Sequence, residues 1–198
     1  MRGTRRDVET MTATIERATA KNIAPAAQTW HIGETTRERA TRYVFAGIRI
    51  ALGWTFLWAF LDKVFGLGHA TEAKNAWING GSPTKGFLTF GAAGPFKDFY
   101  NGIAGAAWAD VLFMTGLAAI GVALLLGIGM RVAAVAGAVL YVMMWTVVLP
   151  PENNPFMDDH LLNAALLVGL ALINAGATLG LGATWAKLPV VQRFPWLR

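Results

Sequence analysis

The sequence contains no cysteine and only three histidines among 198 residues. Without cysteine the chain forms no disulfide, has no thiol nucleophile or persulfide carrier, and cannot hold a cysteine-ligated iron–sulfur cluster. The histidines, His31, His69 and His160, lie in separate segments without HxxxH or ExxH spacing. We therefore expect neither a metal site nor a haem. Phosphate-binding loops and dinucleotide fingerprints are also missing.

Charge is missing from three long stretches of the chain, residues 111–130, 132–151 and 161–186. Runs of about 18 or more apolar residues are typical of membrane-spanning helices, whereas a helix on a soluble core carries a polar stripe. The chain is 55% hydrophobic and has a net charge of +5. Basic residues flank the apolar runs, so the charge marks orientation in a membrane and does not indicate nucleic-acid binding. The sequence predicts an all-α integral membrane protein.

Four spans are expected, and they form a four-helix bundle. Their approximate bounds are 43–63, 111–128, 132–149 and 159–181. Thr35 and Glu38 have the spacing of a capping box, so the first helix is expected to begin near Arg37, outside the membrane. The membrane domain covers residues 37–186, after a polar cytosolic tail over 1–36 and before an interfacial C-terminal tail over 187–198.

The basic residues also predict the orientation. Twelve lysines and arginines fall on the side of the two termini, against three in the long loop between the first two spans. The positive-inside rule therefore places both termini in the cytoplasm and that loop, residues 67–109, outside.

The outer loop carries an amphipathic pattern. Phe96, Phe99, Tyr100 and Ile103 follow helical spacing, which predicts a short amphipathic helix. The stretch "NGGSPTKG", Asn79 to Gly86, is expected to be a flexible turn. Together they predict a lid over the mouth of the bundle.

Polar residues at membrane depth are costly and are functional candidates by default. If the first and fourth helices are neighbours, Arg49 and Asn174 form an inner polar layer. The outer layer then contains Asp62, Lys63, Asp159, His160 and Asn163. The aromatic residues between or beside the layers are Trp54, Trp58, Tyr141 and Trp145. An aromatic pocket with polar groups at its ends suits a flat lipophilic ligand such as a quinone.

Each of these residues also has a purely structural interpretation. Asp158 or Asp159 can cap the fourth helix. Arg49 can extend to lipid phosphates, and Asp62 with Lys63 can form an interfacial ion pair of little energetic value. The tryptophans can be interfacial belt residues.

Four stretches resemble the DoxX/DoxD family of four-helix bacterial membrane proteins. They are "RIALGWTFLWAFLDKVFG", "AWINGGSPTKGFL", "GIGMR" and "ENNPFMDDHLLNAALLVGLAL", and the resemblance covers about residues 40–182. It implies a place in the bacterial cytoplasmic membrane and oxidoreductase activity, with thiosulfate oxidation coupled to membrane quinone in the DoxD branch. It also implies soluble sulfur-transfer or dismutase partners, and it carries Arg49, Lys63, Asp159 and His160 over as site residues.

Three functions compete. In the first, the protein is a quinone-linked redox subunit in which His160, oriented by Asp159, exchanges a proton. Lys63 and Arg49 then attract an anionic substrate or stabilise a negative oxygen. In the second, the chain is a non-catalytic membrane anchor or assembly subunit for a redox or stress-response complex. In the third, a small solute moves along the Arg49–Lys63 face, which requires a homo-oligomer because four helices make a narrow bundle.

Overall fold

The computed structural model describes residues 35–198, so the tail predicted over residues 1–36 lies almost wholly outside the described residues. In the described part every regular element is a helix, which confirms the all-α prediction. Three helices are long and apolar enough to cross a membrane: α2 (Thr36–Phe65), α4 (Ala107–Leu126) and α5 (Met130–Val147). They correspond to the first three predicted spans, with ends shifted by a few residues.

The fourth apolar helix is shorter than predicted. Helix α6 (Asp159–Leu172) has 14 residues and does not continue to Leu181. Asn174 adopts a left-handed backbone with φ of 54°, and a 3-10 turn, η6 (Ala175–Ala177), follows it. A helix needs about 20 residues to cross the hydrocarbon core, so α6 alone falls short of that length.

The chain leaves the helical path after α6 because it packs tightly on the α4–α5 turn. Gly127 and Gly129 shape this turn with φ of 70° and 56°, a backbone region that glycine adopts without steric cost. The amide of Leu181 donates to the carbonyl of Leu126 at 2.7 Å. A Cβ atom on Gly176 would collide with the Gly127 carbonyl, so the two segments meet backbone to backbone.

Arg49 lies fully buried beneath this junction. Its Nη1 donates to the carbonyls of Leu124 and, at 3.0 Å, Leu125. Its Nη2 donates to the carbonyls of Thr178 at 3.3 Å and Leu179 at 2.8 Å. The last carbonyls of a helix have no partner inside it, and the guanidinium supplies donors to the end of α4. We call Arg49 with these four carbonyls the Arg49 clamp.

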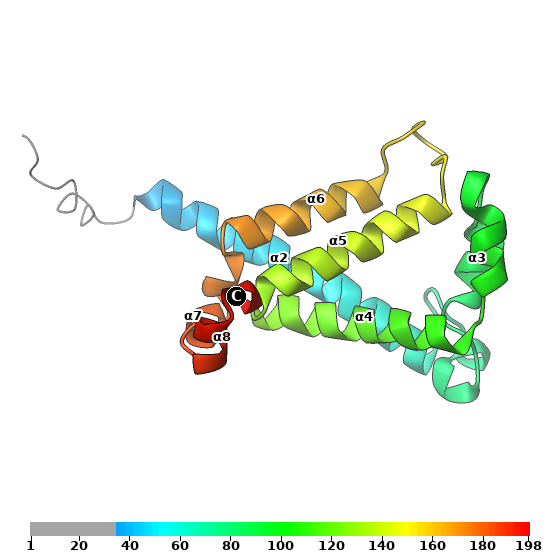
Figure 1. Cartoon of the computed structure of the whole chain (residues 1–198), viewed down its shortest axis with the longest axis horizontal. Coiled ribbons are helices and arrows are strands. Elements are labelled where there is room, and N and C mark those ends of the chain that lie inside the picture. Colours follow the sequence, from blue (N-terminus) through cyan, green and yellow to red (C-terminus); the bar gives the residue numbers. More distant parts are fainter. Residues whose placement is uncertain (1–34) are drawn as a thin grey trace, which may run out of the picture. The chain divides into compact units, whose positions relative to one another are not determined.

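Helix α5 packs between α4 and α6 (Figure 1). Helix α2 approaches α4 at Gly121, where a Cβ atom would lie 2.7 Å from the amide nitrogen of Leu57. The ring of Phe56 on α2 lies 5.0 Å from the ring of Tyr141 on α5. The four apolar helices therefore share one core.

The connecting segment, residues 66–106, links α2 to α4. It contains η2 (Ala73–Asn75), η3 (Trp77–Asn79), the π-helical η4 (Phe87–Gly91), η5 (Gly94–Phe96) and α3 (Lys97–Ile103). Helix α3 coincides with the predicted amphipathic stretch, and its Tyr100 is buried. The segment is folded against the helices, as its contacts with α5 show: the amide of Ala93 donates to the carbonyl of Val147 at 2.9 Å.

The C-terminal segment contains α7 (Gly182–Trp185), α8 (Pro189–Arg193) and η7 (Pro195–Leu197). It is tied to the start of α5 through Arg131. The amide of Arg131 donates to the carbonyl of Arg198 at 2.7 Å, and its Nη1 donates to that of Pro195 at 3.1 Å.

The Arg49 clamp predicts a large loss of stability for Arg49→Met. This change removes the side-chain donor from the partly buried carbonyls of Leu125, Thr178 and Leu179, and an unsatisfied buried carbonyl costs about 1–3 kcal/mol. We expect a loss of at least about 3 kcal/mol in the free energy of unfolding, measured by denaturation in mild detergent. Arg131→Met, at an exposed arginine, is the matched control and should cost less than about 1 kcal/mol. Equal effects for both variants would contradict the clamp.

Candidate functional site

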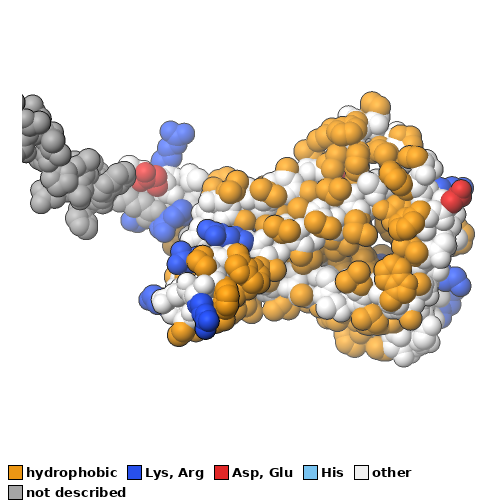
Figure 2. All heavy atoms as spheres, viewed as in Figure 1, with side chains coloured by type: hydrophobic (Ala, Val, Ile, Leu, Met, Phe, Trp, Pro, Cys, Tyr) orange, Lys and Arg blue, Asp and Glu red, His pale blue; other side chains and the backbone are white. Residues whose placement is uncertain are grey.

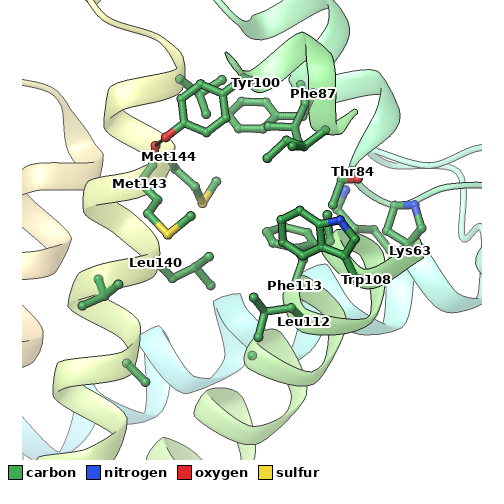
Figure 3. A pocket seen from close by; sticks show the side chains of 18 of the residues that line it. Lys63, Thr84, Phe87, Tyr100, Trp108, Leu112, Phe113, Leu140, Met143 and Met144 are labelled. Atoms are coloured by element: carbon green, nitrogen blue, oxygen red, sulfur yellow. Dashed lines mark hydrogen bonds between the residues drawn. The ribbon is translucent and has the colours of Figure 1, made fainter. Parts of the chain in front are cut away.

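A cavity of about 480 Å³ lies between α4 and α5, closed on one side by the connecting segment. The two helices diverge from their shared turn toward α3 (Figure 1), and the cavity occupies this wedge. Figure 3 shows Phe113, Leu140 and Met144 among the side chains around it. The volume falls in the range of small-molecule sites, about 300–1,000 Å³.

The cavity opens sideways, through the apolar faces of α4 and α5. Trp108 and Leu112 line it from α4 and are 60% and 65% exposed, and Val139 and Met143 line it from α5 and are similarly uncovered. Figure 2 shows a hollow here surrounded by hydrophobic side chains, while lysine and arginine side chains lie toward the ends of the helices. In a bilayer such an opening faces lipid tails rather than water.

Asp110 in the first turn of α4 fixes one wall of the cavity. Its carboxylate is buried and accepts hydrogen bonds from the Ser82 hydroxyl at 2.9 Å and from the Thr84 amide and hydroxyl at 3.0 Å and 2.6 Å. Pro83 and Thr84 are buried and line the cavity. The turn that the sequence analysis expected to be flexible is therefore fastened, because hydroxyl and amide donors converge on one carboxylate.

Tyr100 fixes the opposite wall. Its hydroxyl lies 2.5 Å from the Thr146 hydroxyl and 3.3 Å from the Met143 carbonyl, which joins α3 to α5. The ring remains against the cavity (Figure 3). Phe99 and Ile103 line the cavity beside it, so three of the four residues of the predicted apolar stripe contribute to this wall.

Lys63, near the end of α2, is the one charged residue among the described residues that line the cavity. Its neighbour Asp62 is buried and accepts hydrogen bonds from the amides of His69 at 3.3 Å and Ala70 at 3.0 Å. Asp62 therefore holds the chain that follows α2, and the interfacial Asp62–Lys63 ion pair considered from the sequence is not formed.

The acids at the start of α6 surround His160. Asp158 is the N-cap: its Oδ1 accepts from the Leu161 amide at 3.2 Å, and its Oδ2 lies 2.6 Å from His160 Nδ1. Asp159 is 3.7 Å from the same nitrogen with its side chain 83% exposed. Asp158 thus holds the orienting position that the sequence analysis gave to Asp159. The Tyr141 ring packs 6.1 Å from the imidazole.

The three side chains of this cluster bring their ligand atoms within 4.8 Å of one another, close enough to share a cation. Two of those atoms, Asp158 Oδ2 and His160 Nδ1, already pair with each other. The geometry therefore fits an oriented imidazole at least as well as a metal ligand set.

The remaining candidates are dispersed. Arg49 donates to main-chain carbonyls, while Asn174 is exposed, so the structure does not join them into an inner layer. Trp54 and Trp58 stack on each other at 5.7 Å, and Trp58 meets His69 at 5.2 Å. Trp145 Nε1 donates to the Phe156 carbonyl at 2.8 Å.

Among the predicted site residues only Lys63 lines the cavity. Asn163 is half-buried on α6, one turn beyond His160, and neither of them borders it. Sequence reasoning missed the apolar lining, such as Trp108 and Met143, because an apolar side chain facing a cavity looks the same in sequence as one facing lipid. A signal did exist for Asp110, an acid at the start of an uncharged run.

Over residues 35–198, fold and cavity together define a class: an all-helical protein with helices of membrane-crossing length and a sideways-opening apolar cavity with a single lysine in its lining. No family model, curated protein or solved structure matches the chain.

The cap geometry predicts different effects for the two adjacent aspartates. Asp158→Ala removes the acceptor for the Leu161 amide and the partner of His160, so it should cost about 1–2 kcal/mol of unfolding free energy. Asp159→Ala, at an exposed carboxylate, should change it by less than about 0.5 kcal/mol. Hydrogen exchange at the first turn of α6 should rise only in the first variant. Faster exchange in Asp159→Ala alone would show that Asp159 is the cap.

Proposed function

We propose that the chain is a multi-pass protein of the bacterial cytoplasmic membrane in which α2, α4, α5 and α6 make four crossings. Helix α6 spans about 21 Å by itself. The segment that follows it, up to Leu181, packs against the end of α4 and continues toward the same side, which supports a complete crossing. The excess of basic residues at the termini supports a cytoplasmic location for both.

The absence of cysteine makes this topology directly testable, because each introduced cysteine is unique. Asn75→Cys lies in the connecting segment and Gln192→Cys in α8, both at exposed positions. A membrane-impermeant maleimide should label Asn75→Cys in intact cells and Gln192→Cys only after permeabilisation. Labelling of Gln192→Cys in intact cells would contradict the proposed orientation.

We propose further that the cavity binds a membrane quinone and that the protein is the membrane subunit of a quinone-linked oxidoreductase system. The observation that carries this proposal is the lateral, apolar, partly aromatic cavity with Lys63 at its wall. A quinone ring fits among Trp108, Phe113 and Phe87, and its isoprenoid tail leaves through the lipid-facing opening. The Lys63 ammonium donates a hydrogen bond to a quinone oxygen and stabilises negative charge there.

Quinone accepts or releases two electrons together with two protons when bound. The side chains of this chain bind and orient the ring, exclude water from it, and in Lys63 offer a proton donor. The chain has no cysteine to hold an iron–sulfur cluster, so we propose that electrons reach the cavity from a partner protein. The DoxX/DoxD resemblance suggests a small sulfur anion such as thiosulfate as the source.

His160 takes a different role in this proposal from the one expected from the sequence. It pairs with Asp158 and packs on Tyr141, and it is not among the residues that line the cavity. Lys63 is therefore the polar contact of the ring. The His160–Asp158 pair remains available for proton exchange at the start of α6.

An anchor or assembly subunit is the second candidate. The connecting segment exposes large apolar side chains, among them Phe90 at 88% and Ile78 at 63%. Such side chains could contribute to a contact with a partner where they form one contiguous patch. The solute-pathway function has less support. Arg49, at one end of the Arg49–Lys63 face, is fully buried and its guanidinium is bound to main-chain carbonyls.

A cavity-filling variant separates the quinone proposal from the anchor. Ala136→Phe places a ring in the cavity, whereas Val142→Phe adds the same ring to an exposed position of α5 outside the lining. After purification in mild detergent, mass spectrometry of extracted lipids should find quinone with the wild type and with Val142→Phe. Ala136→Phe should retain less than about a tenth of it, since overpacking closes the site.

Equal quinone content in all three proteins would show that the cavity is not the quinone site. A partner protein that co-purifies without any quinone would favour the anchor.

A further inference from the structure

We propose that the cavity also takes a second class of ligand: single-chain amphiphiles with an anionic carboxylate head, held by an ion pair with Lys63. This inference rests on the proposed function in one respect, because both ligands share the same cavity. A long-chain carboxylate would then compete with quinone and regulate its access.

The ammonium of Lys63 has no close counter-ion among the described residues. No carboxylate in this part of the chain lies within ion-pair distance of it, and the charge of the neighbouring Asp62 acts on it only from further away. Asp62 is held by the amides of His69 and Ala70. Asp110 is held by Ser82 and Thr84. Placing a cation against an apolar wall is costly unless it is paired, and a bound carboxylate would complete the pair.

The lining of the cavity also makes it selective for the head group of a ligand. Every other described side chain along the cavity is uncharged, and most are aliphatic, aromatic or thioether groups. The two hydroxyl groups of the lining are already used, since the Tyr100 hydroxyl bonds Thr146 and the Thr84 hydroxyl bonds Asp110. Lys63 is therefore the charge that distinguishes one amphiphile head from another, and it favours an anion over a neutral or cationic head.

The size of the cavity limits how many acyl chains a bound amphiphile can have. A cavity of about 480 Å³ with a lateral opening accommodates one flexible chain alongside Met143 and Leu112. A phospholipid brings two chains and a bulky head past the fixed walls at Thr84 and Tyr100. The fit therefore favours a free fatty acid over an anionic phospholipid.

The fluorescence of Trp108 can report binding, because Trp108 lines the cavity and bromine atoms quench tryptophan fluorescence on contact. Full-length protein in neutral detergent is titrated with brominated stearic acid and with the matching brominated alcohol. The chain has eight tryptophans, so the fluorescence of Trp108 is obtained as the difference between the wild type and Trp108→Phe. The acid should quench Trp108 at a concentration at least about tenfold lower than the alcohol.

Lys63→Met keeps the length and apolar stem of the side chain but removes its charge. It should weaken binding of the acid about tenfold and leave that of the alcohol unchanged, while Lys63→Arg retains the preference. Lys85→Met, at an exposed lysine of the connecting segment, should bind both as the wild type does. If Lys63→Met does not fold, the preference of the wild type for acid over alcohol decides the question.

Equal affinity for acid and alcohol in the wild type, or unchanged acid binding in a folded Lys63→Met protein, would overturn the proposal. A brominated phosphatidylglycerol that quenches Trp108 as strongly as the free acid would also overturn the choice of a single chain. Displacement of the acid by a short-tailed quinone tests the shared cavity. If acid binding depends on Lys63 but quinone does not displace the acid, the carboxylate site is supported and the proposed quinone function is contradicted.

Discussion

The fold depends on the guanidinium of Arg49. It reaches from α2 to the last carbonyls of α4 and to the chain that follows α6, so it holds three parts of the molecule at one point. In hydrocarbon an unpaired carbonyl costs several kcal/mol, and no water is present to satisfy it. Arg49, a charged residue in an apolar helix, therefore serves as a hydrogen-bond donor to the carbonyls at the end of α4. The negative end of the α4 dipole favours the positive charge there.

The cavity is a consequence of this junction. Helices α4 and α5 are joined tightly at the glycine turn and diverge from it, so their opposite ends would separate without further support. Two side chains supply this support. Asp110 of α4 binds the turn at Thr84, and Tyr100 joins α3 to α5. The space between is lined but not filled. A cavity held open by hydrogen bonds at its rim is pre-organised for a ligand, which lowers the cost of ordering on binding.

Hydropathy was sufficient to predict the helical class and the three long helices, because apolar stretches of about 20 residues with few charges are typical of membrane-spanning helices. It could not predict the end of α6, because residues 161–186 carry no charge that would mark a helix end. The roles of Asn174, Gly176 and Gly180 are seen only in the backbone conformation and in the backbone contacts. Asp158 was one of two adjacent acids that could cap α6, and the choice depends on geometry. Their predicted membrane depth marked Arg49 and Lys63 as functional candidates. The contacts of Arg49 could not be predicted, because the carbonyls that it binds lie 75 to 130 residues away in the sequence. Nor could the place of Lys63 at the cavity be predicted, because the rest of the lining comes from other elements.

The central claim is that the wedge between α4 and α5 is a ligand site with its polar end at Lys63. The most direct test is a cryo-electron microscopy structure of the full chain, purified with its native lipids into nanodiscs. The account predicts elongated density between Trp108 and Met143 that ends beside the Lys63 ammonium and extends to the lipid boundary. A wedge closed by repacked side chains, or ligand density at His160 with none at Lys63, would contradict it.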